Sequence, residues 1–276
     1  MVLFPNCKIN IGLNVIAKRP DGYHDIETVF YPVNWCDALE LMVPSQTNSV
    51  ASGVQFSYTG LPVPGIPANN ICLKAYYLLK KDFPQLPPIS LHLHKCIPTG
   101  AGLGGGSSDG AFTLQLINTK CKLNLSQQQL SAYALQLGSD CPFFIFNTPV
   151  YATGRGEAME PVDLDLSAFS FLIIHPGIHI PTAWAFSQLH PTRPAKSAKH
   201  TIQQPITTWR NELTNDFELP VFQEYPQIAA IKASLYAAGA LYASLSGSGS
   251  AVYGIFTKNE VPELNWDQAY SWKIIL

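Results

Sequence analysis

A glycine-rich segment at residues 98–108 constrains this chain more than any other part of its sequence. Five of the seven positions from Gly100 to Gly106 are glycine, so the backbone N–H groups are uncovered and can turn toward one point. A helix is predicted from near Ser108 to about Lys120, and its N-terminus adds partial positive charge. These properties favour the binding of an anion. We predict a phosphate-binding loop composed of Pro98, Thr99, Gly100, Ala101, Gly102, Leu103, Gly104, Gly105, Gly106, Ser107 and Ser108.

The segment allows three other interpretations. The spacing of Gly100, Gly102 and Gly105 satisfies G-x-G-x-x-G, but a dinucleotide fold needs an acidic residue about 20 positions further on. No Asp or Glu occurs between Asp109 and Asp140. The P-loop pattern fails because Gly106 stands where a lysine is required. A flexible surface turn stays open, although it rarely needs so many glycines directly before a helix.

Composition limits the class of protein. Of the 276 residues, 47% are hydrophobic and 13% are charged, which is enough apolar material for one large domain or two modest ones. Net charge is -2 and no run of Lys or Arg exceeds a pair, so we expect no nucleic-acid partner. No apolar stretch approaches the roughly 20 residues that span a bilayer, and the first ten residues do not form a signal peptide. We expect a cytoplasmic protein without membrane contact, whose six widely spaced cysteines are reduced and mostly buried.

The predicted elements mix helices and strands without regular alternation, which indicates a two-domain α+β fold. The segment at 45–68 predicts a loop with one short strand, and the Pro-, Lys- and Thr-rich segment at 190–208 predicts a mobile excursion. Strands are expected over residues 8–17, 26–33, 89–97, 143–146, 150–153, 241–245 and 252–256, and helices over residues 71–81 after an Asn70 cap, 126–138 with a capping box, and 226–239.

Phosphoryl transfer also needs a cation and a group that orients or deprotonates the attacking hydroxyl. The glycine-rich segment has no lysine of its own, so Lys8 or Lys95 is expected to supply the cation. Asp140 is a candidate base because it follows a helix and precedes the apolar residues 143–146. Alternatively, Lys8 is a solvent-facing lysine on an edge strand, and Asp140 is an ordinary turn residue before Pro142.

Taken together, three segments resemble the GHMP kinase superfamily. They are residues 5–13, residues 98–108 and the later glycine loop Ser246-Gly-Ser-Gly-Ser250, in the family's order. The resemblance implies an α+β architecture with an N-terminal ATP-binding domain over residues 1–156, a C-terminal domain over residues 157–276 and an active site in the cleft between them. It also implies ATP and Mg²⁺ as cofactors. For the family's catalytic pair, it points to Lys8 and Asp140.

Further segments resemble the branch of that superfamily whose substrate is a cytidyl diphosphate. Arg19-Pro-Asp-Gly-Tyr-His24 is similar to its cytidine-recognition segment, although an ordinary hairpin turn with Tyr23 in the core would also fit. Residues 180–186 and 213–218 resemble the family too, the latter without an assigned role. The resemblance implies substrate contacts from Asn10, Tyr23, His24, Thr182 and Phe186, and adenosine contacts from Asn69, Asn70 and Lys95.

Two positions depart from the family pattern. Cys7 replaces the usual alanine before the lysine, and Gly110 stands where a larger residue is common, which would loosen the start of the helix. Two rival functions stay open: a kinase acting on homoserine, mevalonate or a sugar, and a catalytically silent nucleotide-binding protein. As to assembly, we expect a monomer or a weak dimer.

Overall fold

The computed structural model describes residues 1–44, 53–63, 65, 69–258, 260–261 and 270–275. The chain divides into two compact units. Unit 1 contains Met1–Cys7, Asn34–Thr99 and Gly104–Thr148; unit 2 contains Lys8–Val33, Gly100–Leu103 and Pro149–Leu276. Because the segments of the two units alternate along the sequence, the domain boundary near residue 156 stays a prediction.

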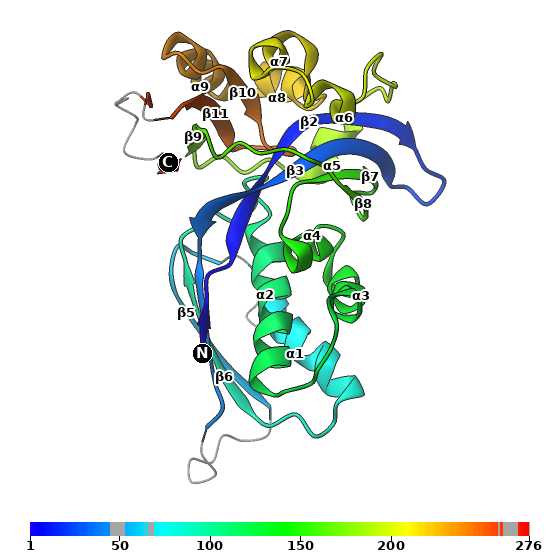
Figure 1. Cartoon of the computed structure of the whole chain (residues 1–276), viewed down its shortest axis with the longest axis vertical. Coiled ribbons are helices and arrows are strands. Elements are labelled where there is room, and N and C mark those ends of the chain that lie inside the picture. The colour runs from blue at the N-terminus through cyan, green and yellow to red at the C-terminus, as the bar shows by residue number, and fades with distance from the viewer. Residues whose placement is uncertain (45–52, 64, 66–68, 259, 262–269, 276) are drawn as a thin grey trace. The chain divides into compact units, whose positions relative to one another are not determined.

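Unit 1 is a four-stranded sheet covered on one face by helices (Figure 1). The strand order is β1-β4-β6-β5, and β5 runs parallel to β6 while the other pairs are antiparallel. Helix α2 packs against β4 and also against the other helices of the unit. The elements are β1 (Val2–Leu3), β4 (Ala38–Met42), β5 (Val54–Gly60), α1 (Ile71–Asp82), β6 (Ile89–Lys95), α2 (Gly105–Lys120), α3 (Gln127–Leu137) and α4 (Cys141–Phe146).

Local sequence signals explain where these helices begin. Asn70 Oδ1 accepts a hydrogen bond from the Cys72 N–H at 2.9 Å, which confirms the predicted cap of α1. Both bonds of the capping box between Ser126 and Gln129 are present at the start of α3. Helix α2 begins at Gly105, three residues earlier than expected. Gly104 caps it with φ of 69°, a left-handed conformation that glycine adopts without strain.

Helix α4 corrects one prediction, because residues 143–146 form its body rather than a strand. Pro142 lies in the first turn, where its missing N–H costs nothing and its fixed φ suits a helix. A short apolar run has no periodicity that distinguishes a buried helix from a buried strand, which is why the sequence misled. Asn147 ends the helix in the left-handed conformation.

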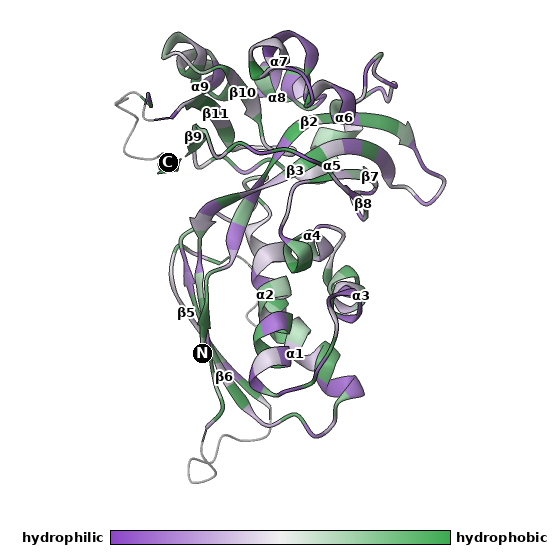
Figure 2. Cartoon of the chain, viewed as in Figure 1, coloured by the Kyte–Doolittle hydropathy of each residue, from purple (hydrophilic) through white to green (hydrophobic). Residues whose placement is uncertain are grey.

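Unit 2 contains two four-stranded sheets with orders β2-β3-β7-β8 and β10-β11-β9-β12. Strands β9 and β11 are predominantly hydrophobic (Figure 2) and buried along most of their length. The predicted strand–turn–strand at residues 241–256 is confirmed. The strands are β2 (Asn6–Lys18), β3 (His24–Cys36), β7 (Val150–Gly154), β8 (Ala158–Pro161), β9 (Phe169–His175), β10 (Tyr242–Leu245), β11 (Val252–Thr257) and β12 (Ser271–Ile275).

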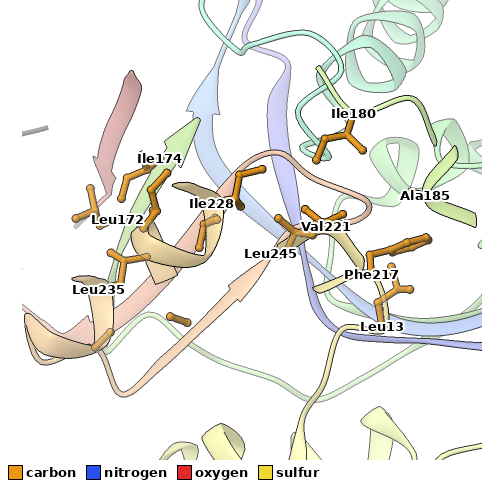
Figure 3. Close-up of a cluster of buried hydrophobic side chains, with 14 of the residues drawn as sticks. Leu13, Leu172, Ile174, Ile180, Ala185, Phe217, Val221, Ile228, Leu235 and Leu245 are labelled. Carbon is orange, nitrogen blue, oxygen red and sulfur yellow. The ribbon is translucent and has the colours of Figure 1, made fainter. Parts of the chain in front are cut away.

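The main core of unit 2 joins β2 to the second sheet and to nearby helices (Figure 3). Leu13 lies beside Phe217, and Val221 lies beside Leu245 in this cluster. Each of these side chains is at least 97% buried, so the cluster fixes β2 against the helices through the hydrophobic effect. The helices of unit 2 are α5 (Thr182–Ser187), α6 (Ala198–Thr201), α7 (Ile206–Glu212), α8 (Glu218–Glu224) and α9 (Pro226–Ala237).

The segment at 190–208 is not the mobile excursion that its composition suggested. It forms α6 and the start of α7, and the Thr192 N–H donates to the Val15 carbonyl at 3.1 Å. Ala198 and Thr201 are buried. The proline and lysine content of this segment therefore did not show that it packs against the rest of unit 2. In the other expected loop, β5 is the predicted short strand, while residues 45–52, 64 and 66–68 lie outside the described residues.

Candidate active site

Strand β2 presents Lys8 and Asn10 side by side inside unit 2. Side chains two positions apart on a strand share a face, and both are buried, with 4% and 2% of their surfaces exposed. Lys8 Nζ donates to Asn10 Oδ1 at 2.5 Å, and Asn10 Nδ2 donates to Thr28 Oγ1 at 3.1 Å. The ammonium lies 4.7 Å from the centre of the Phe30 ring. The alternative of a solvent-facing edge lysine is therefore wrong.

The first half of the glycine-rich loop lies directly against this lysine. The backbone N–H of Lys8 donates to the Leu103 carbonyl at 2.9 Å. Ser246, from the later glycine loop, donates through Oγ to the Gly102 carbonyl at 2.9 Å, and the Ala251 N–H donates to the Ala101 carbonyl at 3.0 Å. Three segments that are far apart in sequence thus meet in unit 2.

Gly102 makes this contact possible. Its φ is +80°, and a Cβ built there would lie 1.9 Å from the Ser246 carbonyl oxygen. A side chain at this position would force the two glycine loops apart. The many glycines therefore serve close backbone packing as well as the predicted phosphate binding, and the interpretation as a flexible surface turn is wrong.

The second half of the loop starts helix α2 in unit 1. Its early N–H groups have no side-chain cap, so they are open to an anion at the helix N-terminus. Ser108 Oγ is buried and has no hydrogen-bond partner among the described residues. A buried hydroxyl without a partner is costly, so a ligand oxygen at this position would satisfy it.

Asp140 lies close to this helix start, also in unit 1. It is the residue before α4, and it does not cap that helix through its side chain. Its neighbour Cys141 hydrogen-bonds Ser107; burial raises the pKa of the Cys141 thiol to about 12, and the Ser107 bond offsets this only in part. Ser107 thus ties the candidate base to the loop. The pairing of Asp140 with Lys8 of unit 2 stays a prediction.

Lys95 is engaged by two carboxylates that the sequence argument missed. Its Nζ lies 2.5 Å from Asp37 Oδ2 and 2.7 Å from Asp109 Oδ2, and all three groups are buried. Burial lowers the pKa of Lys95, but the two carboxylates outweigh it and raise that pKa overall. The Lys95 ammonium is already neutralised, so Lys8 is the better candidate for the loop's cation.

Asp37 extends this ion-pair cluster to the loop. Its Oδ1 accepts from the Cys96 and Ile97 N–H groups at 2.6 and 2.8 Å, directly before Pro98. The cluster therefore joins the start of the glycine-rich loop to helix α2. The sequence signal was weak: Asp37 is a single acid between apolar strands.

Asp109 gives unit 1 a predicted pH dependence. Its pKa is raised from 3.8 to about 7, because burial and the Asp37 charge together outweigh the lowering effect of Lys95. The folded chain then keeps a proton that the unfolded chain releases, so this residue's contribution to the free energy of unfolding falls as pH rises from about 4 to 7. In Asp109→Asn that decline is expected to disappear. Denaturant unfolding at several pH values measures it.

The control for this experiment is Asp163→Asn, an exposed carboxylate in a loop. The difference in free energy of unfolding between the native chain and Asp109→Asn should shrink toward pH 7, and it is compared with the same difference for Asp163→Asn. A pH-independent difference for Asp109→Asn would show that its pKa is not raised.

Two of the residues predicted to contact adenosine, Asn69 and Asn70, lie in unit 1 at the start of α1. Asn69 is exposed and Asn70 caps the helix, so both are placed at a loop–helix junction. Gly110, expected to loosen α2, instead allows close packing: a Cβ there would come within 2.8 Å of Ile71. The adenosine contacts of Asn69, Asn70 and Lys95 stay predictions.

The turn at residues 19–24 projects Tyr23 outward rather than into the core. Tyr23 is 56% exposed, which rules out the core alternative, and the Arg155 guanidinium lies 4.9 Å from its ring centre. Arg19 pairs with Asp21 and Asp25, and Asp21 Oδ1 accepts from the Tyr23 N–H, so the turn is internally braced.

The predicted cytosine-binding residues His24 and Phe186 do come together. Their rings are stacked at 4.8 Å with an interplanar angle of 17°, and Phe186 meets Phe217 edge-on. Burial and the nearby charge of Lys18 lower the pKa of His24, which favours a neutral imidazole that can donate and accept. Because His24 covers one face of Phe186 here, a cytosine that stacks on that face has to displace it. Thr182 begins α5, the helix that carries Phe186.

Comparison with known proteins shows the family to which this chain belongs. Residues 70–148 match the family described as GHMP kinases N terminal domain, and residues 198–264 match GHMP kinases C terminal. The chain belongs to the GHMP kinase family. Both matched segments contain parts of the candidate site: Asp140 and the whole glycine-rich loop fall in the first, and Ser246 in the second.

Two curated relatives of this GHMP kinase match over nearly their whole length. The 4-diphosphocytidyl-2-C-methyl-D-erythritol kinase of Bacteroides thetaiotaomicron is 49% identical over 96% of both chains. The protein of the same name from Cytophaga hutchinsonii is 47% identical over 95% of this chain and 94% of its own.

Solved structures agree with the fold. A crystal structure of 4-(cytidine 5'-diphospho)-2C-methyl-D-erythritol kinase has a TM-score of 0.79 and 29% identity, covering 92% of this GHMP kinase and 90% of that chain. Homoserine kinase from Cytophaga hutchinsonii, at 17% identity and a TM-score of 0.70, covers 98% of this chain and 94% of its own and shows the shared fold alone.

Two further observations on this GHMP kinase bear on the sequence predictions. Within the described part of the chain, no helix is both long and apolar enough to cross a membrane. A pocket of about 420 Å³ in unit 2 is lined by Glu27, Tyr151 and Arg193 among others, but by none of the predicted site residues.

The six cysteines are free thiols, three of them buried.

Proposed function

We propose that this chain is an ATP-dependent kinase that phosphorylates the 2-hydroxyl of 4-diphosphocytidyl-2-C-methyl-D-erythritol, in the non-mevalonate route to isoprenoid precursors. The supporting observation is the meeting of the buried Lys8–Asn10 pair with both glycine loops in unit 2. Relatives that share nearly half of this sequence over its length carry that activity in their names, which supports the choice of substrate.

In the proposed mechanism the chain positions two substrates and offsets charge. N–H groups of the 98–108 loop and of the α2 N-terminus hold the ATP phosphates. Lys8 orients the acceptor hydroxyl and stabilises negative charge that develops on the transferred group, while Asn10 holds the Lys8 ammonium in place. Asp140 accepts the hydroxyl proton as the oxygen attacks the γ-phosphorus; the bond from that phosphorus to the β,γ-bridging oxygen breaks, and ADP leaves.

Mg²⁺ fits the donors at the start of α2. Ser107 and Ser108 offer hydroxyl oxygens, and Ser108 Oγ is buried without a partner among the described residues. Hard oxygen donors together with ATP phosphates suit this cation. When bound there, Mg²⁺ would supply charge neutralisation at the phosphates. Ser107 and Ser108 are the residues that would hold it.

The cytidyl end of the substrate is assigned to Tyr23, His24, Thr182 and Phe186. An aromatic face with a ring-edge donor is the chemistry that a pyrimidine needs. The other kinases considered, which act on homoserine, mevalonate or a sugar, have no use for such a slot. We also propose a cytoplasmic location, since ATP is its phosphoryl donor, and a monomer or weak dimer as its assembly.

An ADP-release assay across a panel of alcohols tests the proposed function. We expect turnover with the cytidyl diphosphate alcohol and little with homoserine, mevalonate or simple sugars. Turnover restricted to an alcohol without a cytidyl group would overturn the choice of substrate. ATP binding without turnover of any alcohol would favour the catalytically silent alternative.

Tyr23→Ala should raise the KM for the cytidyl substrate roughly 5- to 150-fold, because stacking of one base on an aromatic ring contributes about 1–3 kcal/mol. The KM for ATP should change little. Steady-state kinetics with each substrate varied in turn measures both. Tyr58→Ala, another exposed tyrosine, is the control. Equal increases in both KM values would show that Tyr23 does not bind the cytosine ring.

A further inference from the structure

Asn215 lies in the segment between α7 and α8 and is almost fully buried, with 3% of its surface exposed. The backbone around it is fixed to strand β2: the Leu13 N–H donates to the Thr214 carbonyl at 2.8 Å, and the Asp216 N–H donates to the Leu13 carbonyl at 2.9 Å. Leu13 and Phe217 pack together in the core beside it (Figure 3). The residue therefore has a rigid base on the strand that carries Lys8.

The side chain of Asn215 reaches from that base to the later glycine loop. Both hydrogens of its amide are used, since Nδ2 donates to the Leu245 carbonyl and to the Gly247 carbonyl, each at 2.9 Å. Its Oδ1 accepts from the Phe217 N–H at 3.0 Å. These partners fix which end of the Asn215 amide is nitrogen and which is oxygen. The two carbonyls require the NH₂ group as donor, and the Phe217 N–H requires the oxygen as acceptor.

Holding the Gly247 carbonyl also fixes an N–H group of the loop. In a trans peptide the C=O and the following N–H point in opposite directions, and the cis bond described in this loop is the later Gly249–Ser250 one. The Ser248 N–H is therefore turned away from Asn215. Neither it nor the Gly247 N–H donates a hydrogen bond to any described residue.

The loop that carries these open N–H groups lies against the predicted phosphate site. A Cβ on Gly247, whose φ is +58°, would lie 3.4 Å from the Gly102 Cα and 3.5 Å from Asn10 Oδ1. Ser246 bonds the Gly102 carbonyl and accepts from the Asn10 N–H. Open N–H groups beside a glycine-rich loop are the donors that phosphate oxygens use.

We propose that Asn215 is a positioning residue for phosphoryl transfer: by holding the Leu245 and Gly247 carbonyls, it aims the Ser248 N–H at a phosphate oxygen. The assignment rests on the proposed function. It gives a role to the 213–218 segment, which resembled the family without one. The phosphate belongs either to ATP or to the diphosphate of the acceptor, and the experiment separates these two sources.

Asn14 provides a matched control. It is a buried amide that links the same two segments, donating through Nδ2 to Thr214 Oγ1 at 3.1 Å and to Asp216 Oδ1 at 3.0 Å, and it makes no hydrogen bond to the glycine loop. Asn215→Ala removes three side-chain hydrogen bonds, and Asn14→Ala removes two that join strand β2 to the 213–217 segment. Only the first releases the loop carbonyls.

The test compares kcat, both KM values and thermal unfolding of the two variants, together with binding of ATP and of adenosine. Asn215→Ala should lower kcat/KM roughly 10- to 100-fold, the range for losing one hydrogen bond to a charged group. Asn14→Ala should stay within about twofold of the native chain, a change too small to represent such a bond. If Asn215→Ala loses affinity for ATP but not for adenosine, the Ser248 N–H binds a phosphate of ATP. If only the KM for the acceptor rises, the Ser248 N–H binds the diphosphate of the acceptor.

If Asn215→Ala does not fold, Asn215→Asp keeps the shape but cannot donate, and it is expected to show the same kinetic losses. Equal kcat/KM values in the Asn215 and Asn14 variants, with unaltered phosphate-dependent binding, would overturn the role of Asn215. Absence of turnover in the native chain would contradict the proposed function instead. In that case a selective loss of ATP over adenosine binding in Asn215→Ala would still support the inference, and equal binding would overturn it.

Discussion

Replacing Asp140 with asparagine is expected to lower kcat roughly 10²- to 10⁴-fold, the usual contribution of a general base. Asparagine has the same shape but cannot accept the proton of the acceptor hydroxyl. Asp140 does not cap α4 through its side chain, so the substitution should leave the helix in place. ATP affinity should change little, because the proposed contacts to the phosphates come from backbone groups of the loop. Steady-state kinetics and ATP titration measure the two quantities.

Asp163→Asn serves as the control for this variant because it removes an exposed carboxylate in a loop. It should have native kcat. If Asp140→Asn keeps its ATP binding and phosphorylates at the native rate, the assignment of the base is wrong. A loss of ATP binding without a loss of kcat would place Asp140 in the nucleotide site instead.

The second large effect is expected from Lys8→Met, which should lower kcat roughly 10²- to 10³-fold, as does removal of a preorganised group that stabilises transition-state charge. Methionine retains an apolar stem over the Phe30 ring, where the ammonium now lies at 4.7 Å. The buried position should therefore stay filled, and the thermal midpoint should fall little. Kinetics and thermal unfolding on the same preparation measure both.

Lys18→Met, at the exposed end of the same strand, removes a lysine of the same type and should leave kcat unchanged. A native kcat in Lys8→Met would exclude this lysine from the chemistry. A fall in kcat that merely follows a large fall in thermal midpoint would indicate a structural role.

The parts of the fold that carry local chemical signals were predictable from the sequence. The Asn70 cap and the Ser126 capping box depend on hydrogen bonds within three residues, so they could be read directly. Residues 143–146 were misassigned because a short apolar run fits either a helix or a strand. Residues 190–208 were misassigned because their order comes from packing on distant parts of the chain.

The candidate site divides in the same way. The glycine loops and Lys8 stand out by residue type, and the structure brings them together through backbone bonds such as that from Lys8 to Leu103. Asp37 and Asn215 could not be predicted to act there. Each works through contacts with residues 30 or more positions away, and no local pattern reports such contacts.

The most direct test is an experimental structure of the chain with a non-hydrolysable ATP analogue and the cytidyl diphosphate alcohol. We predict that the acceptor 2-hydroxyl lies within hydrogen-bond reach, about 2.6–3.2 Å, of both Lys8 Nζ and an Asp140 carboxylate oxygen. The γ-phosphate should contact the 98–108 loop. A complex in which either side chain lies out of reach of that hydroxyl, or in which the triphosphate binds away from the loop, would contradict this prediction.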